Sequence, residues 1–121
     1  DAALREAEEE VGLARADVRL IGRLTPLHIP VSGFGLHPVV GVALARPVMR
    51  PEPGEVERVI DAPVAELLDP RRHHRVNRVR DGFEFDMPYF DLDGEQVWGA
   101  TAMVLAEFAA ILGVHVQAGQ D

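Results

Sequence analysis

The chain has 121 residues, of which 47% are hydrophobic and 26% are charged, an ordinary composition for a folded protein. This length predicts one domain that spans residues 1–121. The formal net charge of −8 argues against non-specific binding to nucleic acid, which requires a basic surface. The absence of cysteine excludes disulfide bonds and thiolate metal sites.

The sequence predicts a cytoplasmic protein without a membrane partner, because Asp1 and the acidic stretch after it are unlike a signal peptide. The longest apolar run, Ala102–Leu112, is interrupted by Glu107 and is too short to span a bilayer. The chain starts without a methionine and almost directly in a predicted helix, so we expect a fragment of a longer protein.

The first half of the chain predicts one helix followed by strands and loops. Good helix formers before Gly12 indicate a helix, and alternating apolar residues indicate a strand. In chain order we expect a helix at Ala2–Val11, a strand at Asp17–Leu27, a loop at Ile29–Gly35, a strand buried on both faces at Leu36–Ala45, and a proline-rich loop at Arg46–Glu55.

The second half predicts further strands and a C-terminal helix. Aspartate-glycine pairs are strong signals for tight hairpin turns, and a helix that is apolar nearly all round should be buried. We expect a strand at Val56–Pro63, a short helix at Val64–Leu68, two strands within Arg71–Phe90 joined at Asp81-Gly82, a second turn at Asp93-Gly94, and a buried helix at Thr101–Leu112 that ends at Gly113. Helices at both ends of a strand-rich middle predict an α+β or α/β sandwich.

The predicted first helix has one apolar and one acidic side. At about 100° per residue, Leu4, Ala7 and Val11 fall within about 60° of one another and form the apolar stripe. Glu8 falls at the edge of the apolar side. Three glutamates lie roughly opposite the stripe, at spacings i, i+3 and i+4: Glu6, Glu9 and Glu10.

Like charges at these spacings are mildly destabilising unless a cation offsets them. A cluster of carboxylate oxygens suits Mg²⁺ or Mn²⁺. On spacing alone a solvated acidic face is the commoner outcome, and both interpretations stay open.

The order of the residues adds a resemblance. Arg5-Glu6-Ala7-Glu8-Glu9-Glu10-Val11-Gly12-Leu13 is similar to the second half of the Nudix box, Arg-Glu-U-x-Glu-Glu-x-Gly-U with U apolar, at every fixed position. The chain therefore resembles a Nudix hydrolase. The resemblance implies a Nudix-type α/β/α sandwich with a mixed sheet, with the catalytic helix near the start of this chain and a buried C-terminal helix.

The resemblance also implies residue roles. Glu6, Glu9 and Glu10 would be ligands of Mg²⁺ or Mn²⁺, Glu6 would also be a candidate base, and Arg5 would orient the catalytic carboxylate. The box should open with a glycine and a glutamate that both lie upstream of Asp1. We therefore expect a domain that lacks its N-terminal strands and the start of the box.

Three further stretches resemble the coenzyme A diphosphatase group of this family: Gly22–Val42, Gly54–Pro70 and Pro88–Leu105. The implied reaction cleaves the pyrophosphate of coenzyme A, or of its derivatives, into adenosine 3′,5′-bisphosphate and 4′-phosphopantetheine. The alternatives are another nucleoside diphosphate derivative, such as ADP-ribose or NADH, and a binding module of this fold without catalysis. The implied partner is a small nucleotide-type molecule, and the sequence is compatible with a homodimer.

Several other residues are candidates for the site. Glu55 follows the proline-rich loop, where several Nudix enzymes place an auxiliary acid, although a solvent-facing position is equally expected. Arg75 lies in the segment Arg71–Arg80, which either grips a substrate phosphate or, as we favour, is a solvated basic segment. His28 and His37 flank the glycine-containing loop and either line the pocket or, more commonly, are loop or core residues. Three aromatic residues are candidates for stacking on adenine, with core packing favoured for each: Phe34, Phe90 and Trp98.

Overall fold

A computed structural model describes residues 2–29, 33–56 and 58–120, and for residues 114–120 it describes the backbone alone. The described residues form α-helices and antiparallel strand pairs, which confirms the predicted α+β class. The chain divides into two compact units: unit 1 contains Asp1–Leu24 and His37–Ile60, and unit 2 contains Thr25–Leu36 and Asp61–Asp121. The expectation of one domain over residues 1–121 stays a prediction.

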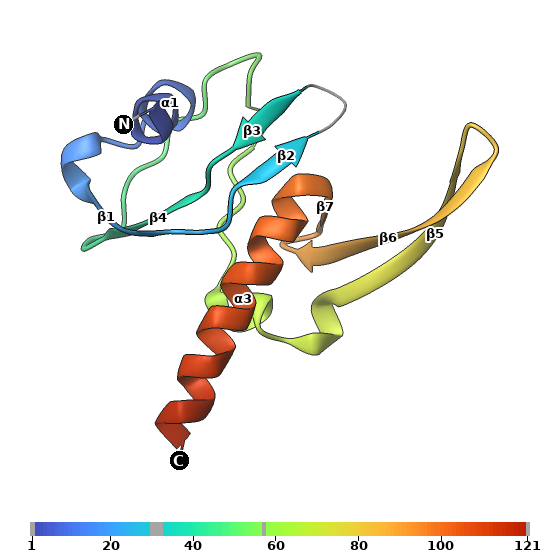
Figure 1. Cartoon of the computed structure of the whole chain (residues 1–121). Helices are drawn as coiled ribbons and strands as arrows, with labels where there is room; N and C mark the ends of the chain where they lie inside the picture. The colour runs from blue at the N-terminus through green and yellow to red at the C-terminus, as the bar shows by residue number, and fades with distance from the viewer. Residues whose placement is uncertain (1, 30–32, 57, 121) are drawn as a thin grey trace. The chain divides into compact units, whose positions relative to one another are not determined.

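Unit 1 contains one helix and one two-stranded ribbon. Its elements are α1 (Ala2–Val11), a 3₁₀ turn (Arg15–Asp17), β1 (Val18–Arg23) and β4 (Val39–Ala43). The two strands pair antiparallel, with Val18 opposite Ala43 and Arg23 opposite Val39 (Figure 1). Helix α1 and the irregular proline-rich loop at Arg46–Glu55 confirm the sequence prediction.

Two expectations for unit 1 are wrong. Within the described part of the chain, the strand predicted to be buried on both faces pairs with β1 alone, and Val42 within it is 42% exposed. The strand predicted at Val56–Pro63 does not form in its described residues, 56 and 58–63. Strand propensity and short apolar patterns are weak signals, because packing against neighbouring segments decides whether a strand forms and how far it is buried.

Unit 2 contains two antiparallel sheets and two α-helices. The first sheet pairs β2 (Leu27–Ile29) with β3 (Phe34–Leu36), where a loop was predicted; residues 30–32 of that loop lie outside the described residues. The remaining elements are α2 (Val64–Leu67), a 3₁₀ turn (Pro70–Arg72), β5 (His73–Arg80), β6 (Phe83–Leu92), β7 (Glu95–Trp98) and α3 (Gly99–Gln120). Strands β5, β6 and β7 form one sheet in that order (Figure 1).

Both predicted hairpin turns are confirmed. Asp81 and Gly82 have φ values of 54° and 79°, and Asp93 and Gly94 have 51° and 79°. Two successive positive φ values define the turn that matches the twist of paired strands, and aspartate-glycine adopts them at low cost. The first turn fixes the long β5–β6 register, in which Arg80 is opposite Phe83.

The buried core of the described residues lies in unit 2. Its members come from α2, β6 and α3 and are 4–7% exposed: Leu67, Phe90, Leu92 and Ala102. Phe90 and Leu92 alternate along β6, so both point to the face of the sheet that packs on α3. Glu107 of α3 accepts hydrogen bonds from the backbone N–H and the hydroxyl of Thr25, at 2.8 and 3.0 Å.

Helix α3 differs from the sequence prediction in length and burial. It continues through Gly113 to Gln120, because a helical glycine costs only about 1 kcal/mol and does not by itself end a helix. It is also not buried all round, since Met103 is 59% exposed and Ile111 is 43% exposed. Among the described residues, neither α3 nor any other helix combines the length and the hydrophobicity that crossing a membrane requires.

Candidate active site

The acidic face predicted for the first helix is present on α1. Leu4, Ala7 and Val11 are half-buried, as the apolar stripe predicts. The residues proposed for catalysis and metal binding are all exposed: Arg5, Glu6, Glu9 and Glu10. No described residue makes an ion pair with any of these four side chains, so the three carboxylates are accessible from solvent.

Glu8 has a different environment from the other glutamates of α1. Its carboxylate accepts a hydrogen bond from the Arg15 backbone N–H at 3.2 Å, and its second oxygen lies 3.6 Å from the Arg15 guanidinium. This contact agrees with the prediction that Glu8 does not join the acidic face. Its role is to connect the helix to the 3₁₀ turn that follows.

The end of α1 is built around Gly12. Its φ of +71° lies in the left-handed region that favours glycine, and its N–H donates to the Glu8 carbonyl at 3.1 Å. A Cβ added at Gly12 would lie 3.2 Å from the Arg50 Cβ, so the helix end and the loop approach closely. Glycine is required here both by the backbone conformation and by the space.

The proline-rich loop attaches to α1 through its backbone. The Arg50 N–H donates to the Val11 carbonyl at 2.6 Å, and the Glu52 N–H donates to the Glu10 carbonyl at 2.7 Å. These two bonds satisfy carbonyl groups that the helix end leaves without an intrahelical partner. The loop is therefore held next to the last turn of α1, which carries Glu9 and Glu10.

Two acidic side chains lie on this loop. Glu55 is exposed, and its N–H donates to the Glu52 carbonyl at 3.2 Å, within a turn that contains Gly54 at φ +85°. Glu52 is a candidate that the sequence analysis missed. In the sequence Glu52 is recognisable only as an acid between two prolines. Its position next to α1 depends on the hydrogen bond from its N–H to the Glu10 carbonyl, which joins residues 42 positions apart.

The donor chemistry of α1 fits a hard divalent cation, because Glu6, Glu9 and Glu10 offer six exposed carboxylate oxygens. Within the described residues, however, no group of three or more His, Asp or Glu side chains lies close enough to hold one metal ion. As they stand, the side chains form a solvated acidic face. Their exposure leaves each one free to turn toward a shared ion, so the metal role of these residues stays a prediction.

The predicted substrate-binding residues have different environments. Phe34 on β3 is 72% exposed, so the favoured core packing is wrong for it, as it is for Trp98, which is 57% exposed. Phe90 is 7% exposed and does belong to the core. His37 is exposed in the segment between β3 and β4, and His28 is exposed within β2. Arg75 on β5 is exposed and lines an open cavity of about 620 Å³ in unit 2.

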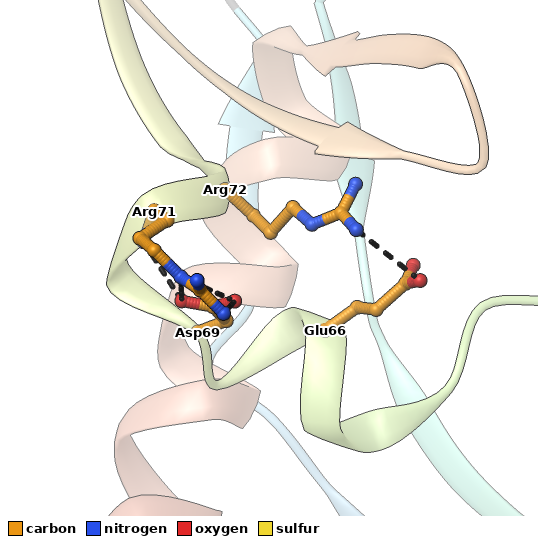
Figure 2. Close-up of polar contacts among 4 residues, drawn as sticks. All are labelled: Glu66, Asp69, Arg71 and Arg72. Carbon is orange, nitrogen blue, oxygen red and sulfur yellow. Dashed lines mark hydrogen bonds and ion pairs between the residues drawn. The ribbon is translucent and has the colours of Figure 1, made fainter.

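Two other arginines of the basic segment have structural partners (Figure 2). The Arg71 guanidinium donates to both oxygens of Asp69, at distances of 3.0 to 3.2 Å, and Arg72 lies 3.6 Å from the Glu66 carboxylate. The side-chain hydrogen bond from Arg71 lowers the pKa of Asp69 below its ordinary value, and the same bond raises the pKa of Arg71. Part of the segment therefore stabilises the turn before β5 instead of binding a ligand.

The sequence is 37% identical over 113 residues to the proteins named uncharacterized Nudix hydrolase NudL in Salmonella paratyphi B, Salmonella newport and Salmonella heidelberg. The chain is similar to Nudix hydrolases. The match takes in 93% of this chain and 58% of each relative, so the chain spans about three fifths of the length of these curated relatives. No protein-family model matches the chain.

The similarity agrees with the resemblance seen in the residues of α1. The α+β architecture is consistent with the fold of Nudix hydrolases. The names of these relatives do not mention coenzyme A, so they do not support the finer assignment to the coenzyme A diphosphatase group.

Proposed function

We propose that this chain is part of a Nudix hydrolase that uses Mg²⁺ or Mn²⁺ to cleave the pyrophosphate of coenzyme A or its derivatives. The products are adenosine 3′,5′-bisphosphate and 4′-phosphopantetheine. The observation that carries the proposal is the exposed carboxylate face of α1, in a nine-residue segment that follows the Nudix pattern. The 37% identity to Nudix hydrolases over 93% of the chain supports the reaction class.

The roles of the side chains are those that the resemblance of α1 to the Nudix pattern implies. A bound divalent cation neutralises charge on the phosphates and lowers the pKa of a water molecule. Glu6, Glu9 and Glu10 would hold the cation through their carboxylate oxygens. Glu6 or Glu55 would be the base that accepts a proton from the attacking water, a role for which a carboxylate is suited. Arg5 orients the catalytic carboxylate.

The attachment of the loop to α1 supports an auxiliary role for its acids. The backbone bond from Glu52 to the Glu10 carbonyl holds the turn with Glu55 near the last turn of the helix. Loops fixed on a rigid element are common positions for catalytic side chains. Glu52 and Glu55 are thus both candidates for the auxiliary acid.

The substrate is tested with the full-length protein and three compounds in Mg²⁺: coenzyme A, ADP-ribose and NADH. We expect coenzyme A to be cleaved into adenosine 3′,5′-bisphosphate and 4′-phosphopantetheine, both identified by mass spectrometry. Cleavage of ADP-ribose or NADH while coenzyme A stays intact contradicts the coenzyme A assignment and keeps the hydrolase class.

A second candidate is a binding module of this fold without catalysis. The observation that favours it is that no three acidic or histidine side chains converge within the part of the chain that the structure describes. A protein that binds one of the three compounds in a titration but hydrolyses none of them is the result that this candidate predicts. The homodimer and the cytoplasmic location stay predictions.

A further inference from the structure

Unit 2 contains an open cavity of about 620 Å³ whose walls differ in chemistry. Strand β5 contributes His74 and Arg75, strand β6 contributes Tyr89 and Phe90, and helix α3 contributes Met103 and Ala106. The volume is within the range of about 300–1,000 Å³ that is typical of small-molecule sites. The cavity thus combines basic side chains from β5 with aromatic and apolar side chains from β6 and α3.

None of the described residues that line this cavity is acidic, although the protein has a net charge of −8. Arg75 is directly opposite Pro88 in the β5–β6 register, so its cross-strand neighbour carries no charge. The nearest acid on the same face of β6 is Asp86, which is opposite Asn77. The cavity is therefore a locally basic site on an acidic protein.

Three basic residues that precede Arg75 along the chain are engaged in the fold. Arg71 and Arg72 pair with Asp69 and Glu66, as Figure 2 shows. The Nε2 atom of His73 lies 2.7 Å from the Leu67 carbonyl oxygen, and because that oxygen can only accept, Nε2 carries the proton in this contact. Arg75 makes no ion pair with any described residue, so its guanidinium is available at the cavity.

The apolar part of the cavity contains Phe90 of β6 and Met103 of α3. The Phe90 ring is part of the core at 7% exposure and gives the cavity a fixed floor, while Met103 is 59% exposed. Methionine is flexible and polarisable, so it adapts to irregular apolar and aromatic groups. A ligand that joins an anionic group to an apolar body would contact both walls at once.

We propose that this cavity binds a phosphomonoester carried on an aromatic or apolar body, with the phosphate on Arg75 and the body against Phe90 and Met103. Guanidinium binds phosphate oxygens in a bidentate geometry, and a dianion gains more from an exposed cation than a monoanion does. The phosphomonoester has two sources. It is either part of the substrate, in which case this inference rests on the proposed function, or part of a separate nucleotide effector.

Binding is measured first, by calorimetric titration of the full-length protein with adenosine 3′,5′-bisphosphate in EDTA, so that metal binding on α1 takes no part. Arg75→Gln should raise the Kd by about 10-fold or more, since a hydrogen bond to a charged group contributes about 1.5–3 kcal/mol. The matched control is Arg78→Gln, which removes the same charge from the same strand on the opposite face of the sheet. It should change the Kd by less than about 2-fold, because exposed charges at a distance are largely screened by salt.

The apolar wall is tested on α3. Ala106→Leu fills part of the cavity and should also raise the Kd, by on the order of 10-fold. The matched control is Ala110→Leu, at an exposed position one turn further along the helix that does not line the cavity, and it should leave the Kd unchanged. Equal effects of Arg75→Gln and Arg78→Gln, or no binding by the wild-type protein at millimolar ligand, overturn the inference.

Kinetics distinguish the two sources. If the phosphate belongs to the substrate, Arg75→Gln raises KM for coenzyme A about 10-fold at unchanged kcat and leaves KM for dephospho-coenzyme A unaltered. If it belongs to an effector, adenosine 3′,5′-bisphosphate changes the turnover of dephospho-coenzyme A without competing, and Arg75→Gln abolishes that change. Turnover that is independent of Arg75 in both experiments overturns a functional role for the cavity. A protein that cleaves no diphosphate refutes the proposed function, whereas the metal-free Kd still decides whether the cavity binds.

Discussion

In unit 2 the side chains of Leu67, Phe90, Leu92 and Ala102 are 4–7% exposed, whereas the apolar stripe of α1 in unit 1 is only half-buried. The candidate catalytic acids are nevertheless in unit 1, on α1 and on the loop attached to its end. The comparison separates two means of stabilisation. Unit 2 is stabilised by burial of apolar side chains. The candidate site is held together by the backbone hydrogen bonds between the loop and α1 and by the conformation of Gly12.

The largest expected effect is the loss of a core side chain in unit 2. Leu92→Ala should lower the free energy of unfolding by about 2–5 kcal/mol, since it leaves a cavity beside Phe90. Urea denaturation followed by the fluorescence of Trp98, the single tryptophan, measures the change. Leu4→Ala on α1 is the comparison in unit 1 and should cost less than half as much. Equal losses of unfolding free energy in Leu92→Ala and Leu4→Ala would contradict the proposed difference between the units.

The second expected effect concerns the acidic face. Glu9→Gln and Glu10→Gln should each lower metal-dependent hydrolysis by on the order of 100-fold or more, since even partners of metal ligands contribute about 10–100-fold. Steady-state rates of coenzyme A cleavage in Mg²⁺ give the measurement. Glu8→Gln is the matched control, because Glu8 is engaged with Arg15, and it should retain activity.

The same variants have an expected stability effect with the opposite sign. Without metal, Glu9→Gln and Glu10→Gln should leave the Tm unchanged or raise it slightly, because each relieves like-charge repulsion of about 0.2–0.5 kcal/mol per pair. A clear fall in Tm without metal would show that these carboxylates stabilise the fold, and unchanged turnover in both variants would refute their assigned roles.

A third, smaller effect concerns the glycine at the end of α1. Gly12→Ala should lower the free energy of unfolding by about 1–2 kcal/mol, because alanine is strained at positive φ and its Cβ would crowd Arg50. Gly113→Ala is the control, and its effect on stability should have the opposite sign. Gly113 lies within α3, and a Cβ added there would point into open space, so alanine should stabilise by about 0.5–1 kcal/mol. Thermal denaturation of both variants provides the test.

The smallest effect is the pH dependence of the turn before β5. Arg71 lowers the pKa of Asp69, so the stabilisation is fully present above the ordinary value of 3.8 and is lost as the pH falls through the lower, folded value. Asp69→Asn should therefore have a lower Tm than the wild-type protein at neutral pH, and the difference should vanish in stronger acid. A Tm difference that is constant from pH 7 to pH 2 would exclude the Asp69 charge as its cause.

Local patterns in the sequence predicted much of the fold. Helix α1, both aspartate-glycine turns and the α+β class were predicted correctly, because each depends on residues close together in the chain. The end of α3 was predicted wrongly. A glycine ends a helix only when the backbone after it makes hydrogen bonds other than the helical ones.

For the candidate site, sequence patterns predicted the exposed face of α1 but not its relation to the loop. The bonds from Arg50 and Glu52 to the helix end join residues about 40 positions apart, and they are formed by backbone groups that every sequence shares. No side-chain pattern indicates such a pairing. Arg75 was a candidate from the sequence, but the cavity that it lines was not predicted. The sequence does not show which arginines of the segment pair with Asp69 and Glu66.

The way the proline-rich loop is fastened to α1 has a consequence for redesign. The main chain makes this connection, so the side chains at positions 52 and 55 can change without loss of the attachment to α1. Proline at position 52 is the exception, because it would remove the N–H that donates to the Glu10 carbonyl. A combinatorial library at these two positions can therefore vary charge and side-chain length while the backbone attachment of the loop is preserved.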